Sequence, residues 1–214
     1  MSKAFDIDTL VDDLKPVRVL KSWHAMALAA AATLIASGLV IYHFGLRADL
    51  AQGIIIPMVL LRGGALLLLG VASLLAAVNT GRPAVGRETG SSGWRWSLAM
   101  AALFPLSALL LWMQGEAVTL ADLHATIGIY CLSIGGAAAL LIGTALTLWL
   151  RRGAPTSPHQ AGWLTGLAAG SLGTFAFSLH CPLTGIYYIG LWYSLTVALS
   201  AIIGRIFVPQ LIRW

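Results

Sequence analysis

The sequence predicts an all-α polytopic membrane protein with six transmembrane helices. Hydrophobic residues make up 58% of the 214 residues, charged residues make up 10%, and the mean hydropathy is +0.85. Soluble domains carry about a quarter charged residues, so this composition favours a bilayer as the solvent. The apolar residues form six segments, and a spanning helix needs roughly 20 such residues. The segments are 24–44, 54–78, 95–113, 124–149, 160–181 and 186–207.

The placement of positive charge predicts how the chain is oriented. Eleven of the 13 lysines and arginines lie before the first segment, between segments two and three, between four and five, or near the end. Because cytoplasmic loops carry the excess of Lys and Arg, both termini are expected in the cytoplasm. The exceptions are Arg47, in an outer loop, and Arg62, inside the second segment. The net charge of +5 suits contact with anionic membrane lipid, and no basic patch indicates direct nucleic-acid binding.

These segments leave no room for a soluble catalytic domain, so we expect a binder, a sensor or a transporter and not an enzyme. The expected parts are a cytoplasmic segment over residues 1–23, a six-helix transmembrane domain over 24–209 and a tail over 210–214.

The N-terminal segment contains a short amphipathic pattern. Ile7, Leu10, Val11 and Leu14 follow the i, i+3, i+4, i+7 spacing of one helix face. A helix of about three turns is not stable alone in water. It would order by docking its apolar face on a partner or by lying flat on the membrane, and the polar face, which carries Asp8, Asp12 and Asp13, disfavours anionic lipid.

Two cysteines and two histidines are expected near the outer side of the bundle. They are His124, Cys131, His180 and Cys181. Thiolate and imidazole suit a transition metal, a disulfide would suit an oxidising compartment, and a reactive thiol would suit a cationic neighbour. Buried cysteine is also an ordinary small apolar residue, and no C-x-x-C spacing decides among these alternatives.

Arg62 is a cation within an apolar segment. Such a residue faces the bundle interior, pairs, or extends to the interface. Its partner is expected to be a backbone carbonyl, water, a loop carboxylate or a bound anion. Because its depth resembles that of Cys131, one hypothesis is that it raises the thiolate fraction of Cys131 or helps to bind an anion.

The fifth segment carries glycines at four-residue spacing, Gly162, Gly166 and Gly170. Small residues on one helix face let a neighbouring backbone approach closely. Packing within the bundle is the simpler interpretation, and a homo-oligomer through these glycines is the alternative.

At several places the chain resembles the NrsF family, six-span bacterial anti-sigma factors that hold an extracytoplasmic-function sigma factor at the inner membrane. The resemblance extends over the whole chain. The residues that carry it are Asp8 to Val17, Gly45 to Leu50, Arg151 to Pro155, Ala161 to Gly170, Leu179 to Pro182 and Leu191 to Tyr193.

The resemblance implies a multi-pass protein of the bacterial inner membrane that sequesters a sigma factor through its N-terminal segment. Our choice of sigma-binding residues is Ile7, Asp8, Leu10, Val11, Asp12 and Leu14. Cys131 and Cys181 would sense stress, with His124, His180 and Arg62 nearby. No cofactor is required, although a transition metal held by the Cys/His cluster, an oxidant or an oxyanion would serve as the signal.

Two other functions compete with this one. A small-solute or ion transporter or channel would use Arg62 to line its path, but the spans carry no acidic residue and the halves show no inverted repeat. A membrane thiol oxidoreductase would normally carry a close C-x-x-C pair.

Overall fold

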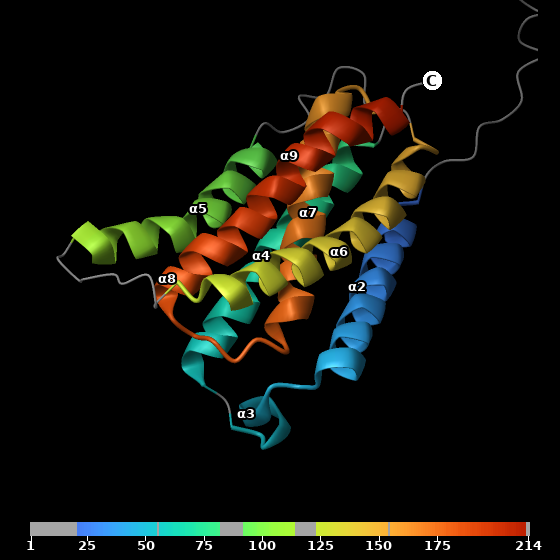
Figure 1. Cartoon of the computed structure of the whole chain (residues 1–214). Coiled ribbons are helices and arrows are strands. Elements are labelled where there is room, and N and C mark those ends of the chain that lie inside the picture. Colours follow the sequence, from blue (N-terminus) through green and yellow to red (C-terminus); the bar gives the residue numbers. More distant parts are fainter. Residues whose placement is uncertain (1–20, 55, 82–91, 114–122, 154, 213–214) are drawn as a thin grey trace, which may run out of the picture.

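The computed structural model describes residues 21–54, 56–81, 92–113, 123–153 and 155–212, and within these ranges the chain is helical, without strands (Figure 1). The elements are α2 (Ser22–Phe44), α3 (Ala48–Ala51), α4 (Pro57–Thr80), α5 (Ser92–Met113), α6 (Ala125–Leu150), α7 (Pro158–Ser178), α8 (Ile186–Tyr188), the π-helical turn η1 (Ile189–Tyr193) and α9 (Ser194–Leu211). The predicted sigma-binding residues of the N-terminal segment lie outside the described residues.

Each of the six predicted segments coincides with a helix to within a few residues, since α8, η1 and α9 run on as one. Four helices are long and apolar enough to cross a membrane, namely α2, α4, α6 and the continuous helix Ile186–Leu211. The helices α5 and α7 lie where the third and fifth spans were expected. The all-α prediction is confirmed, whereas six crossings and the cytoplasmic placement of both termini stay predictions.

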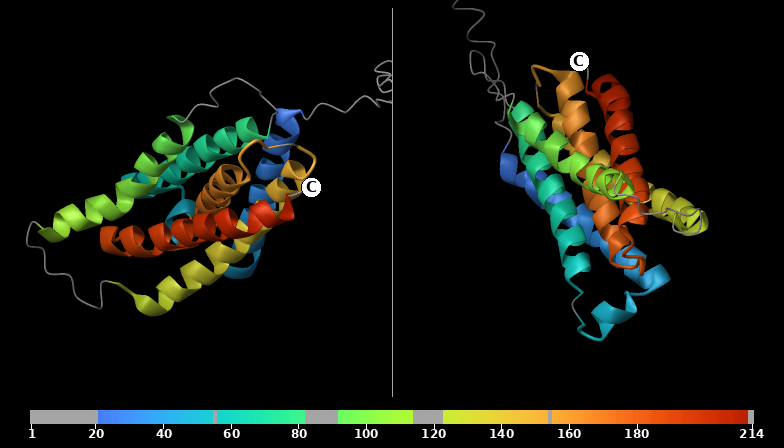
Figure 2. Two further views of the ribbon diagram at one scale, coloured as in Figure 1. Left: turned by 90° about the horizontal axis from the view of Figure 1, so that it is seen from above. Right: turned by 90° about the vertical axis from the view of Figure 1, so that its left-hand side faces the viewer.

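The helix α7 forms the centre of the bundle. It packs most extensively against α9, α6 and α4, and it lies between them in both views of Figure 2. Its residues from Ala161 to Ser178 are nearly all buried. Several are hydroxyl residues that bond their own helix, as Ser171 does to Leu167 O and Thr174 to Gly170 O, both at 2.7 Å. This local bonding lets polar residues lie in a dry core.

The three glycines at four-residue spacing face α9 of the same chain. A Cβ on Gly162 would lie 2.5 Å from Gly204 O, and one on Gly166 or Gly170 would meet Ser200. The expected packing within the bundle is therefore confirmed. The alternative, a homo-oligomer through these residues, gains no support, because α9 covers this face of α7.

Two departures from the expected boundaries matter for function. The helix α7 ends at Ser178 instead of residue 181, so His180 and Cys181 lie in the connection to α8. The one-turn helix α3, which sequence patterns did not predict, follows α2. Figure 1 shows α3 and the α7–α8 connection at one end of the bundle, called here the α3 end, and the start of α2 and the end of α9 at the opposite end.

Candidate functional site at the turn between α7 and α8

The turn over residues 179–185, called here the α7–α8 turn, has carbonyl groups that no helix satisfies. The last carbonyls of a helix lack partners within it, and Pro182 has no N–H to offer. Phe177 O accepts from the N–H groups of His180 and Cys181, at 3.0 and 3.2 Å. The carbonyls of Ser178, Leu179, Cys181 and Leu183 are bonded by groups from elsewhere in the chain.

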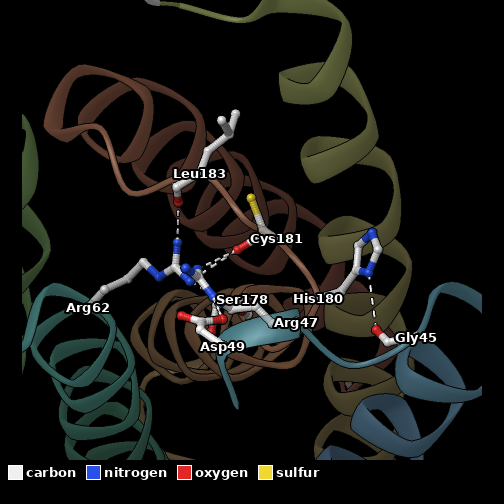
Figure 3. A network of polar contacts seen from close by, with 8 residues as sticks. All are labelled: Gly45, Arg47, Asp49, Arg62, Ser178, His180, Cys181 and Leu183. Carbon is white, nitrogen blue, oxygen red and sulfur yellow. Dashed lines mark hydrogen bonds and ion pairs between the residues drawn. The ribbon is translucent and has the colours of Figure 1, made fainter. Parts of the chain in front are cut away.

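Arg62, on α4, donates to three of these carbonyls. Its Nη1 lies 2.6 Å from Leu183 O, and its Nη2 lies 3.0 Å from Ser178 O and 3.4 Å from Cys181 O (Figure 3). The side chain is fully buried, at 0% exposed, which rules out extension to the interface. The sequence analysis named several possible partners for Arg62, and the structure shows one kind of them, backbone carbonyls. The Cζ atom also lies 5.4 Å from the ring centroid of Tyr193, a favourable cation–π distance.

Arg47 holds the same turn from the other side. Its backbone N–H donates to Leu179 O at 3.1 Å and its Nη1 donates to Cys181 O at 2.6 Å. Its Nε donates to Asp49 Oδ1 at 2.6 Å, and the two side chains form an ion pair. Asp49 belongs to α3, so this ion pair connects Arg47 to that helix. The hydrogen bond from Arg47 lowers the pKa of the Asp49 carboxyl below its ordinary value of 3.8. Asp49 is therefore ionised at neutral pH and balances the charge of Arg47.

His180 fastens the turn to the end of α2. Its Nδ1 donates to Gly45 O at 3.1 Å. Its ring centroid lies 5.4 Å from that of Phe44 and 6.1 Å from that of Phe177. Gly45 has φ of +83°, a conformation that favours glycine. The segment Gly45 to Leu50 and the segment Leu179 to Pro182, 134 positions apart, thus contact each other directly.

The cluster around Arg62 contains buried polar atoms that lack a hydrogen-bond partner within the described residues. They are Arg62 Nε, Asp49 Oδ2 and Tyr193 Oη. Buried polar atoms are normally paired, and such exceptions indicate a strained or functional position. The α3 end therefore combines several bonds to one turn with buried polar atoms that have no partner among the described residues.

Cys131 and Cys181 are free thiols in one buried cluster with Tyr188 and Tyr193. Both cysteines are 0% exposed. Cys181 Sγ donates to Tyr188 Oη at 3.8 Å, and the Tyr188 hydroxyl donates to Ile127 O at 3.3 Å. Cys131 lies in the same buried cluster as Tyr188. Both thiols thus lie in one closed cluster, and an oxidant or metal reaches them only if the packing opens.

The structure does not bring the two histidines to the thiols as metal ligands. His124 precedes α6 with φ of +41° and is exposed, and its ring centroid lies 6.5 Å from that of Tyr188. His180 uses its Nδ1 on Gly45. Across the described ranges, which include all four residues, no group of three or more His, Cys, Asp or Glu side chains is placed to hold a metal ion. The expected four-residue metal site is therefore without support.

Arg47 and Tyr188 were missed as site residues by the sequence analysis. Arg47 was noted as the single basic residue of an outer loop, and Asp49 two positions later was the available signal for a local ion pair. Tyr188 lies in an apolar segment whose pattern gives no hint that its hydroxyl accepts from the Cys181 thiol.

Comparison with known proteins adds the deciding observation. The family model for NrsF, described as negative regulator of sigma F, matches residues 10–214. The chain belongs to the NrsF family. The anti-sigma-F factor NrsF of Caulobacter vibrioides is 34% identical over 175 residues, 78% of each chain. The probable anti-sigma-F factor NrsF of Azospira oryzae is 28% identical over 193 residues, 87% of this chain and 84% of the relative.

The resemblance inferred from the sequence is thereby confirmed, and the NrsF description assigns the family a regulatory role. No solved structure gives a significant match to the chain. Two of the segments that carried the NrsF resemblance, Gly45 to Leu50 and Leu179 to Pro182, are the two that meet through Arg47 and His180.

Proposed function

We propose that this protein is a membrane-bound anti-sigma factor that holds an extracytoplasmic-function sigma factor at the inner face of the bacterial inner membrane. The observation that carries the proposal is the family match over residues 10–214, together with two relatives named as anti-sigma-F factors. Anchoring by apolar helices fits such a role, because a sigma factor kept at the membrane is kept from RNA polymerase.

The sigma factor binds the apolar stripe of Ile7, Leu10, Val11 and Leu14, with Asp8 and Asp12 on its border. A short amphipathic segment that is unstable alone orders when it lays this stripe into a groove on a partner. The start of α2, which follows this segment, lies at the same end of the bundle as the end of α9 (Figure 1). Basic residues are concentrated in the segments at that end of the bundle, which supports a cytoplasmic location for it.

Cys131 and Cys181 respond to stress on the periplasmic side, at the α3 end. An oxidant takes two electrons and two protons from the pair as an S–S bond forms, and a soft metal displaces the thiol protons. Either event changes a packed core around Tyr188. Because the Cys181 carbonyl also anchors Arg47 and Arg62, the change is passed to the end of α2 and to α4. The sigma factor is released if the signal binds the releasing state better than the holding state.

A metal signal would be held by the two thiols themselves, with His124 and His180 outside the ligand set. Arg62 contacts carbonyls instead of a thiol, so its proposed influence on Cys131 acts through the shape of the turn. The transporter alternative has no observation in its favour, because the Arg62 guanidinium is fully buried and bonded.

The proposal is tested by sigma-dependent transcription in cells that carry the chain or lack it. Deleting residues 1–20 should raise transcription as much as deleting the whole gene, while the truncated protein still accumulates in the membrane. Cys131→Ser with Cys181→Ser should keep transcription low and abolish induction by oxidant or soft metal. A truncated protein that still represses would remove the N-terminal segment from the mechanism.

A further inference from the structure

A long apolar groove runs between α6 and α9, with α7 as its floor. Its volume is about 630 Å³. The groove extends along α6 from Leu132 to Arg151, which at 1.5 Å per residue is about 28 Å, close to the thickness of a hydrocarbon core. It lies away from the α7–α8 turn and shares none of its residues.

The groove exists because small residues of α6 lie on this side and large ones form its rim. Nothing lies within 4 Å of a Cβ added at Gly136, and Gly143 is a second small residue on the same wall. Leu140 and Leu148, on α6, are 62% and 55% exposed beside it. Such apolar, outward-facing rims belong against lipid, so the space between them is continuous with the acyl chains of the bilayer.

One end of the groove is cationic. Arg151, at the end of α6, is the single charged residue among those that line it, and its side chain is exposed. Most of the hydroxyls along the walls bond their own helix, as Thr147 does to Gly143 O at 2.7 Å. The lining therefore offers one positive charge at the mouth and an apolar channel below it.

A buried hydroxyl lies in the floor of the groove, between the charged mouth and the apolar channel. Thr165 is 1% exposed, lines the groove, and its Oγ1 lacks a hydrogen-bond partner among the described residues. It is seven residues into α7, about 10 Å below the start of that helix. A ligand with a polar atom a short way below its anionic head would satisfy this hydroxyl.

We propose that this groove binds one anionic phospholipid of the cytoplasmic leaflet. Its phosphate pairs with Arg151, an ester oxygen accepts from the Thr165 hydroxyl, and an acyl chain lies along the small residues of α6 and α9. Charge complementarity selects this occupant over a second copy of the chain. Two copies inserted in the same orientation would bring two Arg151 side chains to one level, and the groove lining holds no carboxylate to offset them.

The experiment is native mass spectrometry of the full-length protein in detergent, titrated with palmitoyl-oleoyl phosphatidylglycerol or the matching phosphatidylethanolamine. The first phosphatidylglycerol should bind about fivefold more tightly than phosphatidylethanolamine, the ratio expected for one arginine near a headgroup. Arg151→Gln should remove this preference. The matched control Arg152→Gln, which alters the exposed neighbour outside the groove, should keep most of it.

A second pair of variants tests the acyl-chain part. Gly136→Leu fills the groove, and nothing lies within 4 Å of a Cβ added at Gly136, so the fold has room for it. It should weaken binding of both lipids. Gly38→Leu, the same change on the exposed face of α2 with equal space, should leave binding unchanged.

Three results would overturn the proposal. A headgroup preference that persists in Arg151→Gln would remove the phosphate site, and unchanged lipid binding in Gly136→Leu would remove the acyl-chain channel. A dimer that Gly136→Leu dissociates would assign the groove to a second copy. These outcomes do not depend on sigma binding, so they are separable from the anti-sigma proposal.

Discussion

Arg47 and Arg62, which come from different segments of the chain, donate to the same main-chain carbonyl, that of Cys181, at 2.6 and 3.4 Å. Arg47 connects that peptide to the α2–α3 segment, and Arg62 connects it to α4 (Figure 3). The side chain of the same residue lies in the thiol and tyrosine cluster. A change at the Cys181 thiol therefore acts on a peptide to which two other parts of the bundle are bonded.

Replacing Arg62 with Met should lower the stability of the protein by about 3 kcal/mol. The change leaves buried carbonyls of Ser178 and Leu183 without donors, and an unsatisfied buried group costs about 1–3 kcal/mol. The measurement is thermal unfolding in detergent followed by tryptophan fluorescence. Arg152→Met is the control, because Arg152 is exposed and its replacement should shift stability by less than about 0.5 kcal/mol. Equal effects of the two changes would contradict the role of Arg62.

Asp49→Asn should destabilise the α3 end at neutral pH, because Arg47 loses its charged partner. The pKa of Asp49 is lowered below 3.8 in the folded protein, so the ion pair stabilises the fold above that ordinary value. Its contribution is lost as the pH falls through the lowered pKa. The difference in unfolding temperature between wild type and variant should stay constant from about pH 8 to pH 5 and shrink only below 3.8. A difference that already vanishes near pH 6 would point to another group.

Gly166→Ala should destabilise the bundle by about 1–3 kcal/mol, since a Cβ there meets the backbone of Ser200 and Ala201 on α9 and forces the helices apart. Gly64→Ala is the matched control, because nothing lies within 4 Å of a Cβ at that position of α4, and it should be neutral or stabilising. Unfolding in detergent gives both values. A destabilised control or a tolerated Gly166→Ala would contradict the packing of α7 against α9.

Both native thiols should resist alkylation in the unstressed protein. Cys131 and Cys181 are fully buried, so a maleimide should react with them slowly in native membranes and rapidly after denaturation. Gln52→Cys, in a background without the two native cysteines, should label at once because Gln52 is exposed at the end of α3. Rapid labelling of Cys181 without stress would contradict the packed state described here.

Sequence patterns located the helices because the length of an apolar run is a local property. The glycines of α7 predicted a close contact with another helix. Their spacing could not tell which helix that is, and the structure shows that it is α9. Arg62 was recognised as anomalous from its apolar neighbours alone. Its partners are carbonyls over 100 positions away, so only the folded chain reveals them.

The expected ligand set found no support for a similar reason. The sequence analysis grouped four residues by their depth along the helices: His124, Cys131, His180 and Cys181. Equal depth does not mean that side chains are close, because they can lie on different sides of the bundle. Because α7 ends at Ser178, His180 turns to Gly45 while Cys181 turns into the core. The position at which α7 ends decides which of these side chains come together. Apolar patterns predict the ends of helices only to within a few residues.

The most direct test of the anti-sigma account is co-purification from native membranes of the wild type beside a Leu10→Asp, Leu14→Asp variant. A Thr9→Asp variant, which adds charge on the opposite face of the predicted helix, is the matched control. We expect a sigma factor to co-purify with the wild type and the control and to be lost from the double variant. A sigma factor retained by the double variant would contradict the N-terminal docking stripe, and the absence of a sigma factor from all three samples would contradict the anti-sigma function itself.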